Sequence, residues 1–322
     1  SESEPMSPLY QRLISPDSSL VIYNNPGPTF DGIYHYHPEL ELSLICDTRG
    51  LAAIGENIHP IFSGDTIMLG PNIPHYWSNE GMEFNNTAPR IMLVFKFTEY
   101  FLGSGFLEIP ECQKLREFIR KAGQGIRFLE PVRSQVSKLM LEIEKITPSL
   151  LRLSKFLELL SLVTETQHLE ILSDQDNCFL GNERQNERID KVYKYVMKNS
   201  STPISLTEVA KQIHMSTEAF CRFFKRSTGN TLNEFIQKTR LARVCQDLMQ
   251  SELSITEIAF DHGFNNLSNF NRQFRKYKRM TPRDYRKIFQ ESPLGTPTEH
   301  LSNKWEADMD FSLFDQNSIT SS

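Results

Sequence analysis

The sequence predicts an α+β protein of more than one domain: an antiparallel β domain, a pair of helices, and an all-helical C-terminal domain. Three observations carry this prediction. Short segments that alternate apolar and polar residues fill residues 20–97, apolar residues recur at helical spacing beyond residue 132, and a Thr-Glu-Val/Ile-Ala segment occurs twice beyond residue 200. With 322 residues and 39% hydrophobic content, the chain can bury two or three cores.

The N-terminal part reads as seven or eight short strands separated by Gly, Pro and Asn. The segments between Leu20 and Phe97 are LVIYN, GIYHYH, ELSLIC, LAAIG, NIHPIF, DTIMLG and RIMLVFKF. Strands of this length, separated by turns, favour a small antiparallel barrel or sandwich.

Two amphipathic helices are expected next, over residues 132–146 and 150–163. In the second, leucines stand at alternating steps of three and four residues, as in a coiled-coil seam. They are Leu150, Leu153, Leu157 and Leu160. Two interpretations remain open: the pair covers the β domain, or it forms a homodimer contact.

The stretch from Ile255 to Tyr277 has the pattern of a helix-turn-helix unit. Gly263 suits a turn that needs positive φ, and Ala259 is small enough for two helices to cross closely. In the second helix, Phe270 and Phe274 share one face, while Ser268, Arg272 and Arg275 lie opposite. A cationic face of this kind suits a helix in a DNA major groove, although a solvated surface helix has the same pattern.

A second copy of this pattern favours DNA binding. Residues 206–226 repeat the unit, with Glu218, Arg222 and Lys225 opposite three phenylalanines, and Ser216 or Thr217 can cap the reading helix. The helix expected over Thr231–Gln250 would span about 30 Å, close to the distance between successive major grooves on one side of DNA. The charge agrees, since residues 186–290 hold 19 Lys and Arg against 10 Asp and Glu, whereas the rest holds 16 against 30.

These residues resemble the AraC/XylS family of bacterial transcription regulators. The matching elements are TEVA at residues 207–210, Arg240-Leu241-Ala242, IAFDHGF at residues 258–264, and Thr281-Pro282 followed by Tyr285-Arg286. The resemblance implies a DNA-binding domain of two helix-turn-helix units joined by a long helix. The residues expected to contact DNA are Glu218, Cys221, Arg222 and Lys225 in the first unit, and Leu267, Ser268, Asn271, Arg272 and Arg275 in the second.

Two N-terminal segments, GIYHYHPELE at residues 32–41 and GDTIMLGPNIPH at residues 64–75, resemble the two cupin motifs. The cupin metal ligands correspond to His35, His37, Glu41 and His75, a set that suits a divalent transition metal. In an extended strand, positions 35, 37 and 41 project to one face, although Pro38 can bend the strand. Three interpretations stay open: a metal site, a metal-free pocket for a polar ligand, and structural histidines.

The expected domains are a cupin-like ligand-sensing and dimerisation domain at 1–172 with the helical pair at 108–172, a linker at 173–185, a DNA-binding domain at 186–290, and a disordered acidic tail at 291–322. No stretch resembles a signal peptide or a membrane span, and five cysteines without a CxxC pair suit reduced thiols in a cytoplasm.

The expected function is a cytoplasmic, homodimeric transcription regulator, not an enzyme, controlled by a small polar metabolite such as a sugar. Its partners would be promoter DNA and the effector, with RNA polymerase as a candidate and no membrane. No cofactor is required, and a divalent transition metal is a candidate ligand. The alternatives are a metal-dependent cupin isomerase or dioxygenase fused to a DNA-binding domain, and a constitutive DNA-binding protein whose cupin only dimerises.

Overall fold

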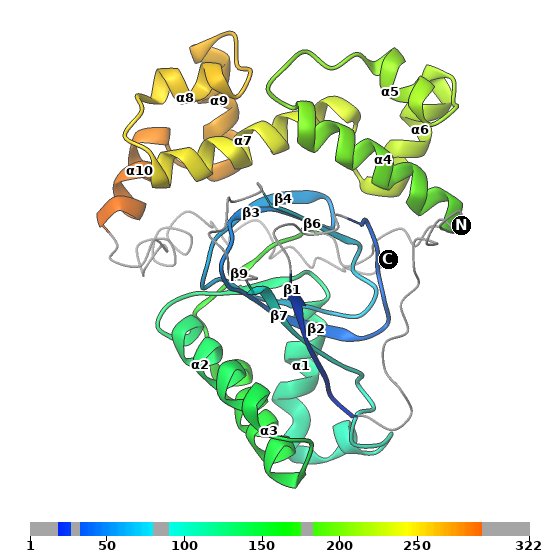
Figure 1. Ribbon diagram of the computed structural model, residues 1–322, viewed down its shortest axis with the longest axis vertical. Coiled ribbons are helices and arrows are strands. Elements are labelled where there is room, and N and C mark those ends of the chain that lie inside the picture. Colours follow the sequence, from blue (N-terminus) through cyan, green and yellow to red (C-terminus); the bar gives the residue numbers. More distant parts are fainter. Residues whose placement is uncertain (1–18, 27–32, 80–89, 175–182, 292–322) are drawn as a thin grey trace, which may run out of the picture.

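The computed structural model describes residues 19–26, 33–79, 90–174 and 183–291. Figure 1 shows a layered arrangement in which helices α1 to α3 lie below the β-sheets and the C-terminal helices lie above them. The predicted tail at 291–322 lies outside the described residues, apart from its first residue, and so does most of the predicted linker. None of the helices in the described ranges is both long and apolar enough to cross a membrane.

The β domain consists of two antiparallel sheets. Sheet A has the strand order β1-β7-β2-β5-β8-β9, and sheet B has the order β4-β3-β6. The strands of sheet A are β1 (Val21–Pro26), β2 (Leu40–Ile45), β5 (Thr66–Leu69), β7 (Arg90–Phe97), β8 (Ile126–Phe128) and β9 (Leu169–Ile171). Those of sheet B are β3 (Gly50–Ile54), β4 (Asn57–Ile61) and β6 (His75–Asn79). Among the described residues the hydrogen-bonded strand orders form two sheets and not the closed ring of a barrel.

The prediction of a strand over GIYHYH was wrong. Within this segment the described residues make one isolated bridge, between His35 and His75, and the chain bends at Pro38 and Glu39 before β2 begins. Proline has no backbone N–H to offer a ladder, so pairing stops there. His35, His37 and Glu41 therefore do not lie along one continuous strand.

Alternation along the strands sorts side chains onto two faces of sheet A. Leu40, Leu42 and Leu44 of β2 pack in the core beneath the sheet, together with Phe156 of α3. Glu41 and Ser43 point to the opposite face, toward the core shared with sheet B. The helices beneath are α1 (Gln113–Ala122), α2 (Val132–Lys145) and α3 (Leu150–Glu165), preceded by the short turns η1 (Phe106–Glu108) and η2 (Pro110–Cys112).

The structure shows what the predicted leucine seam contacts. Leu153, Leu157 and Leu160 of α3 pack in the core beneath sheet A, so most of the seam covers the β domain. Leu150 and Leu151, at the start of α3, stay 84% and 59% exposed.

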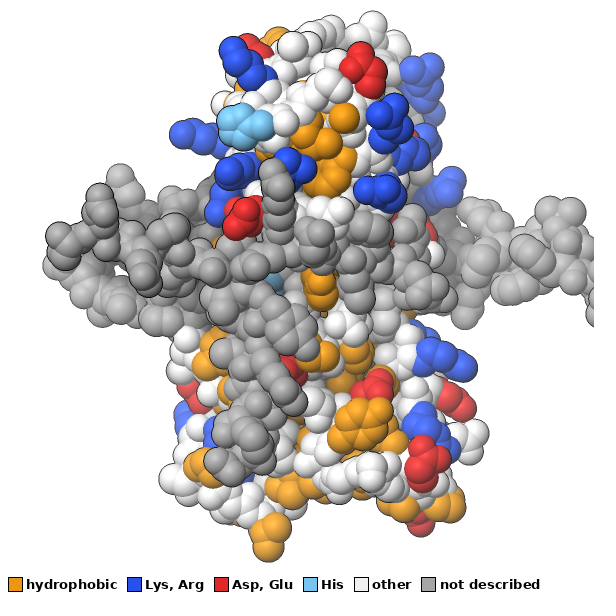
Figure 2. All heavy atoms as spheres, turned by 90° about the vertical axis from the view of Figure 1, so that its right-hand side faces the viewer, with side chains coloured by type: hydrophobic (Ala, Val, Ile, Leu, Met, Phe, Trp, Pro, Cys, Tyr) orange, Lys and Arg blue, Asp and Glu red, His pale blue; other side chains and the backbone are white. Residues whose placement is uncertain are grey.

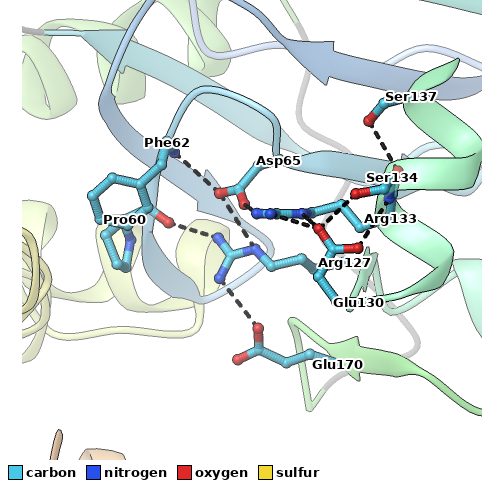
Figure 3. Close-up of polar contacts among 9 residues, drawn as sticks. All are labelled: Pro60, Phe62, Asp65, Arg127, Glu130, Arg133, Ser134, Ser137 and Glu170. Atoms are coloured by element: carbon cyan, nitrogen blue, oxygen red, sulfur yellow. Dashed lines mark hydrogen bonds and ion pairs between the residues drawn. The ribbon is translucent and has the colours of Figure 1, made fainter. Parts of the chain in front are cut away.

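Ion pairs around the buried Asp65 tie α2 to sheet A (Figure 3). Arg127 of β8 lies 3.8 Å from Asp65 and donates to Glu170 of β9 at 3.1 Å. Arg133 of α2 lies 3.7 Å from Asp65 and pairs with Glu130 at 2.7 Å. Burial raises the pKa of Asp65, opposed by the two arginines. Removing one partner of such a network leaves a buried charge uncompensated, so the network fixes how α2 sits on the sheet.

The C-terminal domain contains only helices. They are α4 (Glu183–Asn199), α5 (Leu206–Gln212), α6 (Thr217–Thr228), α7 (Leu232–Gln250), α8 (Ile255–Asp261), α9 (Leu267–Lys278) and α10 (Pro282–Glu291). Helix α7 starts with a capping box of Thr231 and Glu234, and α8 with one of Ser254 and Glu257. The predicted cap of α6 is confirmed, since Ser216 accepts a hydrogen bond from the Ala219 N–H.

The C-terminal domain contains two apolar clusters. The cluster of the first unit includes Phe220, Phe224 and Phe235. The cluster of the second unit includes Phe270 and Phe274. The predicted turn is confirmed: Gly263 has φ +80°, and a Cβ at this position would lie 2.5 Å from the Ser201 carbonyl oxygen. Only glycine fits this turn without strain.

Candidate nucleic-acid interface and effector site

Helix α6 presents the first predicted DNA-reading face. Phe220, Phe223 and Phe224 are buried against the domain core, which fixes the rotation of the helix. The residues predicted from the opposite face are all exposed: Glu218, Cys221, Arg222 and Lys225. Of these, Lys225 lies 4.0 Å from Glu234, a distance at which solvent weakens the attraction.

Helix α9 presents the second face. Ser268, Asn271, Arg272 and Arg275 are exposed, whereas Leu267 is half-buried and packs against the second core. Arg272 donates to the Asn269 side chain at 2.9 Å. Sequence reasoning did not select Asn269, although it stands one turn before Arg272 on the same side of the helix.

The two reading helices flank α7, whose 19 residues separate the units by about 28 Å. Figure 2, viewed from the right-hand side of Figure 1, shows Lys and Arg side chains spread over the visible face of the upper, helical part of the molecule. Two exposed basic helices that are separated by roughly one turn of DNA suit binding in two adjacent major grooves.

A second site lies between the sheets. It contains the histidine cluster, His35, His37 and His75, whose ring nitrogens lie within 4.8 Å of one another. His75 faces this space from β6, together with Trp77, while Tyr76 points to the other side of sheet B. The bend at Pro38 thus leaves the three predicted imidazoles together.

Backbone carbonyls fix how the three imidazoles are oriented. The Nδ1 atoms of His35, His37 and His75 lie 2.8, 3.0 and 2.8 Å from the carbonyl oxygens of Ile33, Glu39 and Ile73. A carbonyl oxygen only accepts, so the Nδ1 atoms of His35 and His75 carry the proton and their Nε2 atoms offer a lone pair. Both ring nitrogens of His37 face acceptors, because its Nε2 lies 3.0 Å from the Glu41 carboxylate. Neutral imidazoles held in this way are the ligand form that transition metals bind.

Burial keeps two members of the cluster neutral. It lowers the pKa of His35 to about 4, and with the nearby His35 ring it lowers that of His75 well below its ordinary range. The Nε2 atom of His75 is buried without a hydrogen-bond partner.

The fourth predicted ligand, Glu41, is engaged elsewhere. Its Oε2 lies 3.0 Å from His37 Nε2, 3.9 Å from His75 Nε2 and 3.1 Å from Lys96 Nζ. Burial alone would raise the pKa of Glu41, but the Lys96 ammonium and the His37 contact hold it well below its ordinary range. Three imidazoles fit a divalent transition metal, whereas the carboxylate is already compensated by an internal cation.

Lys96 was missed by sequence reasoning. It is fully buried on β7, directly across from Glu41 of β2 in the strand register. A lysine among apolar residues of a strand, in RIMLVFKF, was the available signal, since lysine is rarely buried unless paired.

Comparisons with known proteins agree with the repeated helical units. A family model described as a helix-turn-helix domain matches residues 209–288. The chain is 24% identical over 285 residues to the transcriptional activator RhaR of Mannheimia succiniciproducens, covering 86% of this chain and 94% of that protein. It is 24% identical over 255 residues to the activator RhaS of Pectobacterium atrosepticum, covering 78% and 86%. A solved AraC-type regulator from Chromobacterium violaceum shares 25% identity over 35% of this chain and 99% of that chain, with a TM-score of 0.33.

Two helix-turn-helix units with exposed basic faces, together with the family model and the two activators, define a DNA-binding transcription regulator. The chain is an AraC-type DNA-binding transcription regulator, similar to RhaR and RhaS, with an N-terminal β-rich domain.

Proposed function

We propose that this regulator has a cupin-type sensor domain, and that a small polar metabolite, such as a sugar, binds at the histidine cluster and sets its affinity for promoter DNA. One observation supports this most: two buried polar atoms without hydrogen-bond partners, His75 Nε2 and Glu39 Oε2, lie in or beside the cluster. An unpaired buried polar group costs about 1–3 kcal/mol, and a polar ligand would satisfy both atoms.

A metal ion is the second candidate effector, favoured by the Nε2 lone pairs of His35 and His75 and by the closeness of the third ring. His35, His37 and His75 would hold the ion, which would then present open positions to a polar ligand. Glu41 would complete the set only by giving up its contact with Lys96.

DNA contact is proposed for the exposed residues of α6 and α9, Glu218, Cys221, Arg222, Lys225, Ser268, Asn271, Arg272 and Arg275, with Leu267 supporting α9 from the core side. The names of the relatives favour an activator, which would also contact RNA polymerase. A homodimer would double the groove contacts. Leu150 and Leu151 are exposed apolar side chains, and we propose that they form the contact between the two copies.

Thermal melting of the full chain tests the sensor proposal. Sugars and small acids would be screened with and without a chelator, and DNA affinity measured for each hit. An effector at a hundred times its Kd should stabilise the fold by about 2.7 kcal/mol. A shift that survives chelation identifies a metal-free effector, whereas a fall in melting temperature on chelation alone identifies a metal. If DNA affinity stays constant with every compound and with the chelator, the protein is a constitutive binder.

A further inference from the structure

The effector site and the DNA-binding domain lie on opposite faces of the same strands. Along β6, His75 faces the space between the sheets, and Tyr76 faces the C-terminal domain. The same alternation places His35 inward and Tyr34 outward. The two segments are joined by a pair of backbone hydrogen bonds, from His35 N to His75 O at 3.1 Å and from His75 N to His35 O at 2.9 Å. A shift of either histidine backbone must therefore move both tyrosines.

Both tyrosines contact one residue of the C-terminal domain. The ring centroid of Tyr193 on α4 lies 5.0 Å from that of Tyr34 and 5.5 Å from that of Tyr76. The Tyr34 backbone N–H also donates to Asp190 of α4 at 3.1 Å. Tyr193 is itself 1% exposed. On the outward face of the histidine-bearing segments, the two tyrosines thus pack against a buried aromatic ring of the C-terminal domain.

Tyr193 in turn belongs to the core of the first helix-turn-helix unit. Its ring lies 4.3 Å from Phe235 of α7 and 6.4 Å from Phe224 of the reading helix α6. Close-packed rings pass from one arrangement to another and do not slide continuously. A displacement of Tyr193 would therefore reorient α6 relative to α7.

Other contacts hold the domains together without touching the histidine-bearing segments. Lys238 of α7 donates to the Glu56 carbonyl at 2.8 Å and to Asn57 at 2.9 Å, and Gln246 donates to the Gly50 carbonyl at 2.5 Å. These bonds hold α7 against sheet B at two points, Lys238 and Gln246. The reading residues Arg222 and Arg272 remain exposed, so docking does not cover the reading faces.

We propose that Tyr34 and Tyr76, through Tyr193, transmit the state of the histidine cluster to the first reading helix, whereas Lys238 and Gln246 only hold the domains together. This inference rests on the proposed sensor function. Because coupling is reciprocal, DNA held by α6 also favours one arrangement of the histidine-bearing segments.

A mutant cycle on the full chain tests the link without knowledge of the effector. The probe is a duplex that the wild-type protein selects from a random-sequence pool, and the Kd is measured for each variant. His75→Gln perturbs the cluster and should change the Kd about fivefold or more in the wild-type background. In the Tyr34→Leu/Tyr76→Leu background the same substitution should change it less than about twofold.

Two further backgrounds separate the link from docking in general. Tyr34→Phe/Tyr76→Phe keeps both rings and should retain the His75→Gln effect. Lys238→Ala weakens docking alone and should also retain it. An unchanged Kd for a random duplex shows that the DNA-binding domain of each variant is folded.

The proposal is overturned if His75→Gln leaves the Kd unchanged in the wild type, if its effect persists in the leucine background, or if Lys238→Ala abolishes it equally. Failure of the sensor function is a separate result, in which no compound shifts DNA affinity although His75→Gln does.

Discussion

The Glu41 carboxylate lies 3.1 Å from the Lys96 ammonium, and both side chains are almost completely buried between the two sheets. They are direct neighbours across β2 and β7. The pair balances one negative and one positive charge beside imidazoles that burial keeps neutral. Lys96 thus supplies the positive charge that a metal would otherwise bring to Glu41.

Lys96→Met should destabilise the protein by about 3–5 kcal/mol, because it leaves Glu41 as an uncompensated buried charge. Urea denaturation measures this free energy of unfolding. The double substitution Glu41→Gln/Lys96→Met should recover most of the loss, since neither charge then remains.

Lys114→Met is the matched control. Lys114 pairs with Glu165 at 2.5 Å, but both are more than half exposed. It should change stability by at most about 1 kcal/mol. A loss at Lys96 no larger than this would mean that water compensates Glu41.

Gly263→Ala should destabilise the second helix-turn-helix unit more than Gly103→Ala destabilises the N-terminal β-rich domain. Both glycines have positive φ, which costs alanine about 1–2 kcal/mol. At Gly103 nothing lies within 4 Å of the added Cβ, whereas at Gly263 the Ser201 carbonyl oxygen lies 2.5 Å away. Urea denaturation compares the two variants, and equal losses would show that the Ser201 backbone moves freely.

His59 should make stability depend on pH. Burial lowers its pKa to about 3, and its Nε2 lies 2.7 Å from the Leu172 carbonyl oxygen. The folded pKa is below the unfolded value of about 6.5, so this stability is present above pH 6.5 and is lost as pH falls toward 3. His59→Gln should reduce the slope of stability against pH by about 1.4 kcal/mol per unit in this range. An unchanged slope between pH 6 and 4 in urea titrations would mean that His59 takes up a proton while folded.

Much of the fold follows from local patterns. Short apolar segments between turns predicted β2, β3 and β4, and helical spacing predicted α5 to α9, because each of these helices buries one regular face. The missed strands β8 and β9 have three residues each and exist only through long-range pairing. Strand β6 was also missed, and it begins directly after the prolines of PNIPH, which lack the backbone N–H that strand pairing uses.

The same distinction between local patterns and long-range contacts separates the site residues that were predicted from those that were missed. Motif spacing brought out His35, His37 and His75, which converge as predicted. Lys96 and Tyr193 could not be found in this way. Their partners lie far along the chain, and strand register or domain docking brings them together.

Leu150→Glu/Leu151→Glu should dissociate the proposed homodimer. Both leucines are largely exposed at the start of α3, so the monomer loses no buried contact. Burying one leucine is worth about 1.5–3 kcal/mol, hence the dimer Kd should rise at least tenfold. Sedimentation equilibrium measures this change, with unaltered urea stability as the check on folding. A wild-type protein that sediments as a monomer would refute the dimer.

Arg272→Ala should weaken binding to the selected duplex by about 1–3 kcal/mol while leaving random DNA almost unaffected, because an arginine bidentate to guanine reads sequence. Arg272 is exposed on α9, and its hydrogen bond to Asn269 at 2.9 Å limits its rotamers. Asn269→Ala should therefore cause a smaller loss with the same selectivity. Arg120, an exposed helical arginine in the N-terminal domain, supplies the control: Arg120→Ala should have no effect. Fluorescence anisotropy supplies the Kd values. Equal losses on both duplexes would make Arg272 a phosphate contact, and no loss on either would place DNA on another face of α9.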